Sequence, residues 1–150
     1  MQHVQTRSTT SALVLTAVLI ALATLFTMYT KIPVPGIRGY FNVGDVVIMT
    51  SALLLGRKYG AYIGAIGPAL ADLFLGYAVF VPITFVVKGI EGYLVGTVYN
   101  NKTTTSALVA TIVGGIVIVA GYFIAEYFVF DPGVAIASIL TNTIQAVMSV

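Results

Sequence analysis

The sequence contains no cysteine, and its single histidine, His3, lies in a polar, tag-like N-terminal stretch. Without cysteine the chain can form no disulfide, no thiolate metal site and no cysteine nucleophile. Walker, G-x-S-x-G and H-E-x-x-H motifs are absent as well. The sequence therefore predicts a protein that is not an enzyme and that has neither a metal site nor a cofactor.

Charged residues are also scarce, since Asp, Glu, Lys and Arg together make up 8% of the 150 residues. A soluble domain carries roughly 25% charged residues and could not cover its surface with so few. Hydrophobic residues make up 59%, and the mean hydropathy is +1.02. The sequence thus predicts an all-α integral membrane protein, with residues 1–150 forming a single membrane domain. A net charge of +2 gives no reason to expect a nucleic acid as partner.

Six apolar segments predict a bundle of six transmembrane helices in the lipid bilayer. They cover about 11–29, 43–55, 59–75, 79–99, 106–129 and 133–150. A helix needs about 20 residues to cross about 30 Å of hydrocarbon, so the short second segment is nearer to a partial span. Asp131 followed by Pro132 predicts the start of the last helix. The threonines at 103–105 predict the start of the fifth.

The basic residues between these segments predict the orientation, because cytoplasmic loops carry an excess of Lys and Arg. With a cytoplasmic N-terminus, the inner segments carry Arg7, Arg57, Lys58 and Lys102. The outer loops carry Lys31 and Arg38. Four against two favours this orientation, and six spans then place the C-terminus in the cytoplasm too.

Small residues spaced four apart predict where helices approach each other closely in lipid. Gly60 and Gly64 form such a pair in the third segment, and Gly92 and Gly96 form one in the fourth. For these two segments we expect packing within the chain.

The fourth segment carries a lysine and a glutamate inside an apolar run, in "VVKGIEGYLVG" at 86–96. An ionised group at the bilayer centre costs at least about 2.5 kcal/mol. Lys88 and Glu91 are three residues apart and so face the same side of a helix, which predicts that they pair. Such a buried pair is either part of a functional site or a structural lock of the helix.

Other polar residues occur in the predicted spans at comparable or shallower depth. Asn142 and Gln145 are again three apart, near the middle of the last segment. They are either pocket residues or hydrogen-bonding links between helices. Asp72, Asp45 and Glu126 lie near predicted helix ends, where solvation at the membrane interface is the simpler expectation. If these groups converge, they form a polar pocket that opens to the outside.

Several motifs in order resemble the S components of energy-coupling factor (ECF) vitamin transporters, closest to the riboflavin-type family. They are "FNVGDVVIMTSALLLGRKYGAYIGAIGPALADLFLG", then "FVPITFVVKGIEGYLVG", then the N-x-x-Q of the last segment. Together they cover about residues 40–97 and 139–146. The resemblance implies a six-helix bundle in the cytoplasmic membrane of a prokaryote, with both termini cytoplasmic.

The resemblance also implies a high-affinity site for a small water-soluble vitamin, open to the outside and capped by residues 30–42. The positions that match family motifs and line the outward half are Lys88, Glu91, Asn142, Gln145 and Asp72. The ligand stays open at this point between riboflavin, a pyridoxine-like compound, a thiamine-precursor pyrimidine and pantothenate.

Partners follow from the same resemblance. An S component does not hydrolyse ATP but docks on a transmembrane T subunit that carries two ATPase subunits. Ala17 and Ala21 match the small-residue element of the first helix that contacts the T subunit.

Two other classes of protein remain open from the residues. A structural membrane subunit without a small ligand would use the same polar residues only to hold helices together. A stand-alone secondary transporter would need a titratable relay and often an internal repeat, and no repeat is detectable here.

Overall fold

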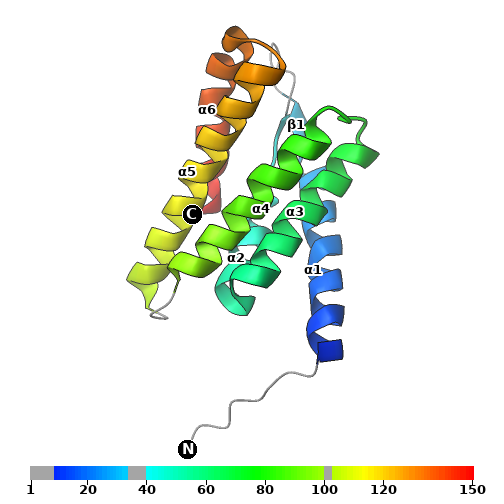
Figure 1. Cartoon of the computed structure of the whole chain (residues 1–150), viewed down its shortest axis with the longest axis vertical. Coiled ribbons are helices and arrows are strands. Elements are labelled where there is room, and N and C mark those ends of the chain that lie inside the picture. The colour runs from blue at the N-terminus through cyan, green and yellow to red at the C-terminus, as the bar shows by residue number, and fades with distance from the viewer. Residues whose placement is uncertain (1–8, 34–39, 100–102) are drawn as a thin grey trace, which may run out of the picture.

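The computed structural model describes residues 9–33, 40–99 and 103–150, and the structural statements below concern these residues. Six helices alternate in direction through the bundle (Figure 1). They are α1 (Thr9–Tyr29), α2 (Asp45–Leu55), α3 (Arg57–Phe74), α4 (Phe80–Val98), α5 (Thr104–Val129) and α6 (Pro132–Ser149). Each corresponds to one predicted segment, and every end agrees to within two residues.

Three of the helices are long and apolar enough to cross a membrane: α1 over Thr10–Tyr29, α4 and α5. By the same measure α2, with 11 residues, is too short, as its sequence suggested. The helices α3 and α6 have 18 residues each but are more polar. The chain is therefore a multi-pass membrane protein in which polar side chains concentrate on particular helices.

The ends of α5 and α6 form as their sequences predict. The Asp131 side chain accepts a hydrogen bond from the Val134 backbone N–H at 3.0 Å, with Pro132 in the first turn of α6. The Thr103 side chain accepts one from the Ser106 N–H at 3.1 Å and caps α5. These caps satisfy backbone donors that have no partner inside the helix.

A short antiparallel ladder between α1 and α2 was not predicted. β1 (Ile32–Pro33) pairs with β2 (Tyr40–Phe41), with Ile32 opposite Phe41. Pro33 is tolerated in β1 because both strands of a two-stranded ladder are edge strands. Of the predicted cap at 30–42, positions 34–39 lie outside the described residues.

The helices pack as two groups joined by α4. In Figure 1, α5 and α6 lie side by side on one flank, α1 packs against α3 on the other, and α4 lies between α3 and α5. The α2 helix packs against both α3 and α4. The ladder of β1 and β2 lies at the end of the bundle opposite the start of α1 (Figure 1).

The contact between α3 and α4 depends on glycine, as predicted. A Cβ atom on Gly92 would lie 2.1 Å from the backbone oxygen of Gly60. A Cβ on Gly64 would lie 2.2 Å from the backbone oxygen of Lys88. The two backbones touch directly, and this close approach positions Lys88 within the bundle.

Candidate ligand-binding site

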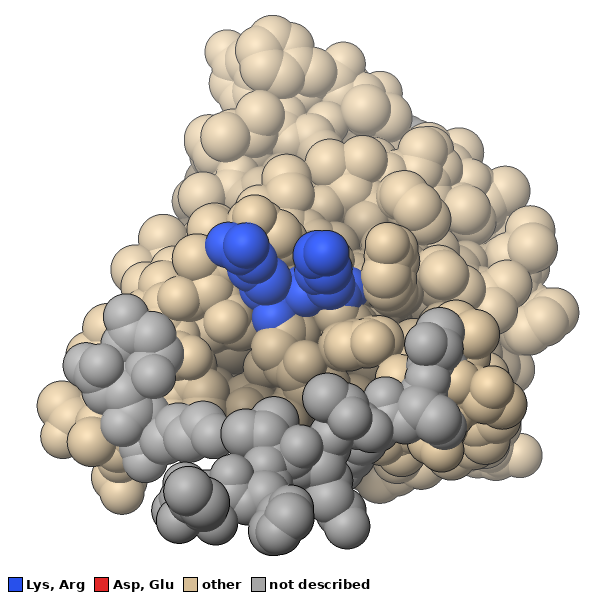
Figure 2. All heavy atoms as spheres, turned by 60° about the horizontal axis from the view of Figure 1, so that its bottom comes forward, with Lys and Arg blue, Asp and Glu red and all other residues tan. Residues whose placement is uncertain are grey.

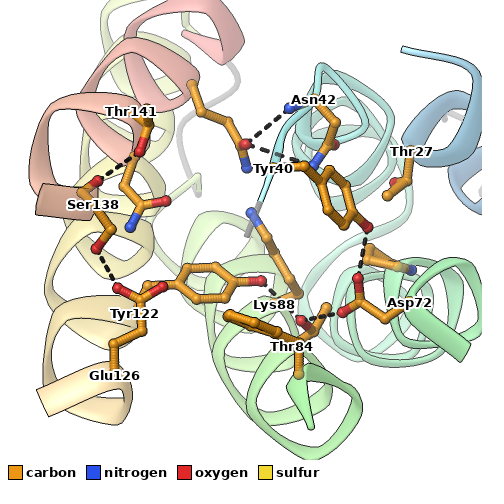
Figure 3. Close-up of a pocket in the computed structure, with 14 residues that line it drawn as sticks. Thr27, Tyr40, Asn42, Asp72, Thr84, Lys88, Tyr122, Glu126, Ser138 and Thr141 are labelled. Atoms are coloured by element: carbon orange, nitrogen blue, oxygen red, sulfur yellow. Dashed lines mark hydrogen bonds between the residues drawn. The ribbon is translucent and has the colours of Figure 1, made fainter. Parts of the chain in front are cut away.

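A polar cavity of about 40 Å³ lies in the half of the bundle nearer to β1 and β2. Its walls come from α1, β2, α3, α4, α5 and α6 (Figure 3). The lining residues are Thr27, Tyr40, Asn42, Pro68, Asp72, Phe80, Thr84, Lys88, Tyr122, Glu126, Ser138, Thr141, Asn142 and Gln145. Four of the five predicted ligand-binding residues line it, and Glu91 does not.

Lys88 lies at the centre of the site with only 1% of its surface exposed. Its Nζ donates a hydrogen bond to Asp45 Oδ1 at 2.5 Å. It lies 3.3 Å from Glu91 Oε2, so the predicted ion pair with Glu91 is confirmed. The geometry nevertheless makes Asp45 the closer partner, and neither oxygen of Glu91 accepts a hydrogen bond.

Asp45 is 1% exposed, so the expectation of a solvated carboxylate at the membrane interface was wrong. The physical reason is that the start of α2 is turned into the bundle. Gly44, just before it, packs so closely on α1 that a Cβ atom would lie 2.2 Å from Thr27 Oγ1. The first carboxylate of α2 therefore points at Lys88 instead of at water.

Gln145 connects three elements around this ion cluster. Its Nε2 donates to Asp45 Oδ2 at 2.6 Å, which links α6 to α2. Its Oε1 accepts a hydrogen bond from the backbone N–H of Asn42 at 3.1 Å, which links α6 to the residue after β2. Gln145 thus both lines the cavity and ties α6 to α2 and to the residue after β2.

Asp72 is buried on the opposite wall, so its expected interfacial solvation was also wrong. Both of its oxygens are occupied, Oδ1 by the Tyr40 hydroxyl at 2.6 Å and Oδ2 by the Thr84 hydroxyl at 2.5 Å. Burial, together with the negative charge of Asp72, raises the pKa of the Tyr40 hydroxyl. Tyr40 therefore stays protonated and remains a donor to Asp72.

Glu126 is the third acid whose burial the sequence did not predict, with 3% of its surface exposed. It accepts a hydrogen bond from the Ser138 hydroxyl, because α5 and α6 pack side by side at this level. One helical turn after Ser138, Asn142 lines the same cavity, and its Nδ2 is buried without a hydrogen-bond partner. The Thr27 hydroxyl is likewise buried and unpartnered.

Sequence reasoning missed the hydroxyl groups of the site. A signal existed, because residues four apart share a helix face. Thr84 precedes Lys88 by four, Tyr122 precedes Glu126 by four, and Ser138 precedes Asn142 by four. The helices α4, α5 and α6 thus each present a row of polar side chains to the cavity.

Ala17 and Ala21 lie elsewhere, on the exposed side of α1. Large apolar neighbours such as Val14, Val18 and Leu25 are exposed on the same side. α3 packs on the other side of α1, where a Cβ on Gly67 would lie 2.8 Å from the Cβ of Ala23. The partner interface at Ala17 and Ala21 stays a prediction.

The fold as a whole matches that of a solved S component of a bacterial ECF transporter. The TM-score is 0.75 at 21% identity, over 93% of this chain and 89% of that one. At sequence level, residues 7–150 match the family described as "ECF-type riboflavin transporter, S component". The chain belongs to this family of transport subunits, and the sequence-based assignment to the S components is confirmed.

Two curated relatives align with this chain over most of their own length. A protein of Pyrococcus woesei, described only as an uncharacterised protein, is 41% identical over 130 residues, which is 85% of this chain and 86% of that protein. The thiamine precursor transporter HmpT of Lactococcus lactis subsp. cremoris (strain MG1363) is 32% identical over 135 residues, or 89% of this chain and 75% of HmpT.

Proposed function

We propose that the protein spans the cytoplasmic membrane of a prokaryote six times with both termini inside, and that the polar cavity is its outward-facing vitamin site. The charge distribution supports this orientation. Arg57 and Lys58 are exposed at the α2–α3 turn, at the same end of the bundle as the start of α1. In the described part of that face, Figure 2 shows Lys and Arg side chains and no acidic ones, as expected of a cytoplasmic face.

The substrate that fits best is a single-ring thiamine-precursor pyrimidine. The observation that carries this choice is the size and polarity of the cavity. Sites for drug-sized ligands have volumes of about 300–1,000 Å³, whereas this cavity holds about 40 Å³ between polar side chains. A small ring requires less rearrangement of those side chains than the three-ring flavin of riboflavin. The name of the relative HmpT points in the same direction.

Within this site we assign the direct contacts to Lys88, Asn142, Gln145 and Asp72. Glu91 is predicted from the sequence as a fifth contact, but it lies behind Lys88 and does not line the cavity. Its role in the proposal is to position Lys88.

The proposed partners are a transmembrane T subunit and two ATPase subunits, which would supply the energy for uptake. The exposed side of α1 around Ala17 and Ala21 is the proposed contact with the T subunit. Small residues there would allow a partner helix to approach closely.

The substrate is tested by what the purified protein carries and what stabilises it. We expect mass spectrometry of the denatured protein to release a pyrimidine. We also expect 4-amino-5-hydroxymethyl-2-methylpyrimidine to raise the melting temperature in detergent, because a ligand at 100 times its Kd stabilises by about 2.7 kcal/mol. Stabilisation by riboflavin, pyridoxine or pantothenate alone would overturn the choice of substrate. No response to any of the four compounds, with nothing released, would favour a structural subunit.

The Asn142→Ala variant tests the site. Because the Asn142 Nδ2 is a donor without a hydrogen-bond partner in the described protein, its loss removes no hydrogen bond of Nδ2 from the empty protein but one from the complex. We expect the pyrimidine to bind roughly tenfold more weakly, with little change in melting temperature. The matched control is Thr143→Ala, on the neighbouring exposed position whose hydroxyl bonds only to its own helix. Equal affinities of the two variants in a calorimetric titration would remove Asn142 from the site.

A further inference from the structure

We propose that Glu126 is the specificity-determining residue of this site and selects ligands that present an N–H donor to it, as the amino group of a 4-aminopyrimidine does. The inference rests on the proposed function and goes further, because it says which edge of the ring is recognised and by which residue.

The two acids that line the cavity, Asp72 and Glu126, differ in how many of their oxygens accept a hydrogen bond from the protein. Asp72 is satisfied, since Tyr40 and Thr84 each donate to one of its oxygens. Glu126 receives one hydrogen bond, from Ser138 to Oε2, and no described residue donates to its other oxygen. Of the two carboxylates, Glu126 is the one that has an oxygen without a donor among the described residues.

No cation within the described site competes for that acceptor. Lys88 is the only Lys or Arg among the lining residues, and it already contacts Asp45 and Glu91. Figure 3 shows Glu126 and Ser138 on one side of the cavity and Tyr40 and Asp72 on the other, with Lys88 between them. An ionised carboxylate accepts hydrogen bonds and cannot donate, so Glu126 favours a ligand N–H.

Asn142 supplies the complementary group on the same wall. It follows Ser138, the partner of Glu126, by one helical turn on α6, and its buried Nδ2 lacks an acceptor. The wall of α5 and α6 therefore offers an acceptor close to a donor. A 4-aminopyrimidine presents the matching edge, with an amino N–H next to a ring nitrogen that accepts.

The 4-oxo form of the same ring reverses this edge, with a carbonyl oxygen next to a ring N–H. Asn142 can adapt by turning its amide, because one end donates and the other accepts. The ionised Glu126 has no donor to turn toward the ligand, so the oxo ligand would bring a carbonyl oxygen against a carboxylate. Buried polar groups left without partners are the strongest basis for rejecting a close analogue.

The test compares two probes, 4-amino-5-hydroxymethyl-2-methylpyrimidine and its 4-oxo counterpart, by calorimetric titration of the detergent-purified protein. We expect the wild-type protein to bind the amino compound at least tenfold more tightly. In Glu126→Gln, which keeps the size of the side chain and can still accept from Ser138, the amide can donate to the carbonyl. We expect the amino compound to bind about tenfold more weakly, the oxo compound to bind more tightly, and the preference to fall to near one.

The matched control is Asp131→Asn, which removes an acid from the exposed turn between α5 and α6 and keeps the helix cap, since Asn caps about as well as Asp. Its preference should equal that of the wild type. If Glu126 has a purely structural role, the Glu126→Gln variant binds both compounds more weakly by the same factor. This result would overturn the inference. Equal binding of the two compounds by the wild type would overturn it too, while leaving the proposed function intact. Failure of both compounds to bind would overturn both proposals.

Discussion

Replacing Lys88 with methionine is expected to destabilise the folded protein by about 3–5 kcal/mol, the usual effect of breaking a buried ion pair. Asp45 and Glu91 are 1% and 0% exposed, and both lose their cation in this variant. In a thermal unfolding experiment in detergent, we expect a melting temperature roughly 10 °C lower or more. The variant should be measured without ligand, so that binding does not contribute.

Two further variants separate charge from size. Lys58→Met removes a lysine from the exposed first turn of α3 and should leave the melting temperature unchanged. Adding Asp45→Asn and Glu91→Gln to Lys88→Met removes the unpaired charges and should restore much of the lost stability. A single Lys88→Met variant as stable as the wild type would show that Lys88 does not hold the helices together.

The second large effect is expected from Gly92→Ala, which adds one methyl group where α3 and α4 touch. The added Cβ would lie 2.1 Å from the Gly60 oxygen, so the backbones must separate. Overpacking of this kind costs about 1–3 kcal/mol, and rigid backbone on both sides places this site at the upper end. Thermal unfolding of the detergent-purified variant measures the loss.

Gly89→Ala is the graded control on the same helix. Its added Cβ would lie 3.2 Å from the Cβ of Ala65, a tight contact that a small shift relieves. We expect a clearly smaller loss of stability than for Gly92→Ala. If the two variants unfold at the same temperature, the direct backbone contact does not set the spacing of α3 and α4.

The helices were predictable because each is specified locally by an apolar run, and α5 and α6 also by a residue that caps the first turn. Asp131 and Thr103 cap α6 and α5 from within three residues of the groups that they satisfy. The ladder of β1 and β2 was not predictable on the same grounds. It is two residues long on each side, too short to produce an alternating pattern.

The site was predictable only as far as its contacts are local. Lys88 and Glu91 are three residues apart, and helical spacing alone pairs them. Asp45 lies 43 residues from Lys88 and 100 residues from Gln145 along the chain, so no spacing rule brings these three together. Their proximity depends on how α2 is turned into the bundle.

The hydrogen bonds of Gln145 have a kinetic consequence. They join α6 to Asp45 and to Asn42 beside a cavity that is much smaller than a vitamin-sized molecule. If this cavity is the binding site, as proposed, a ligand of that size enters only after the lining side chains have moved apart, and the links of Gln145 are among those that hold them together. The observed association rate should level off at high ligand concentration, at the rate of opening. The apparent Kd then equals the intrinsic Kd divided by the fraction of molecules in which the cavity is open.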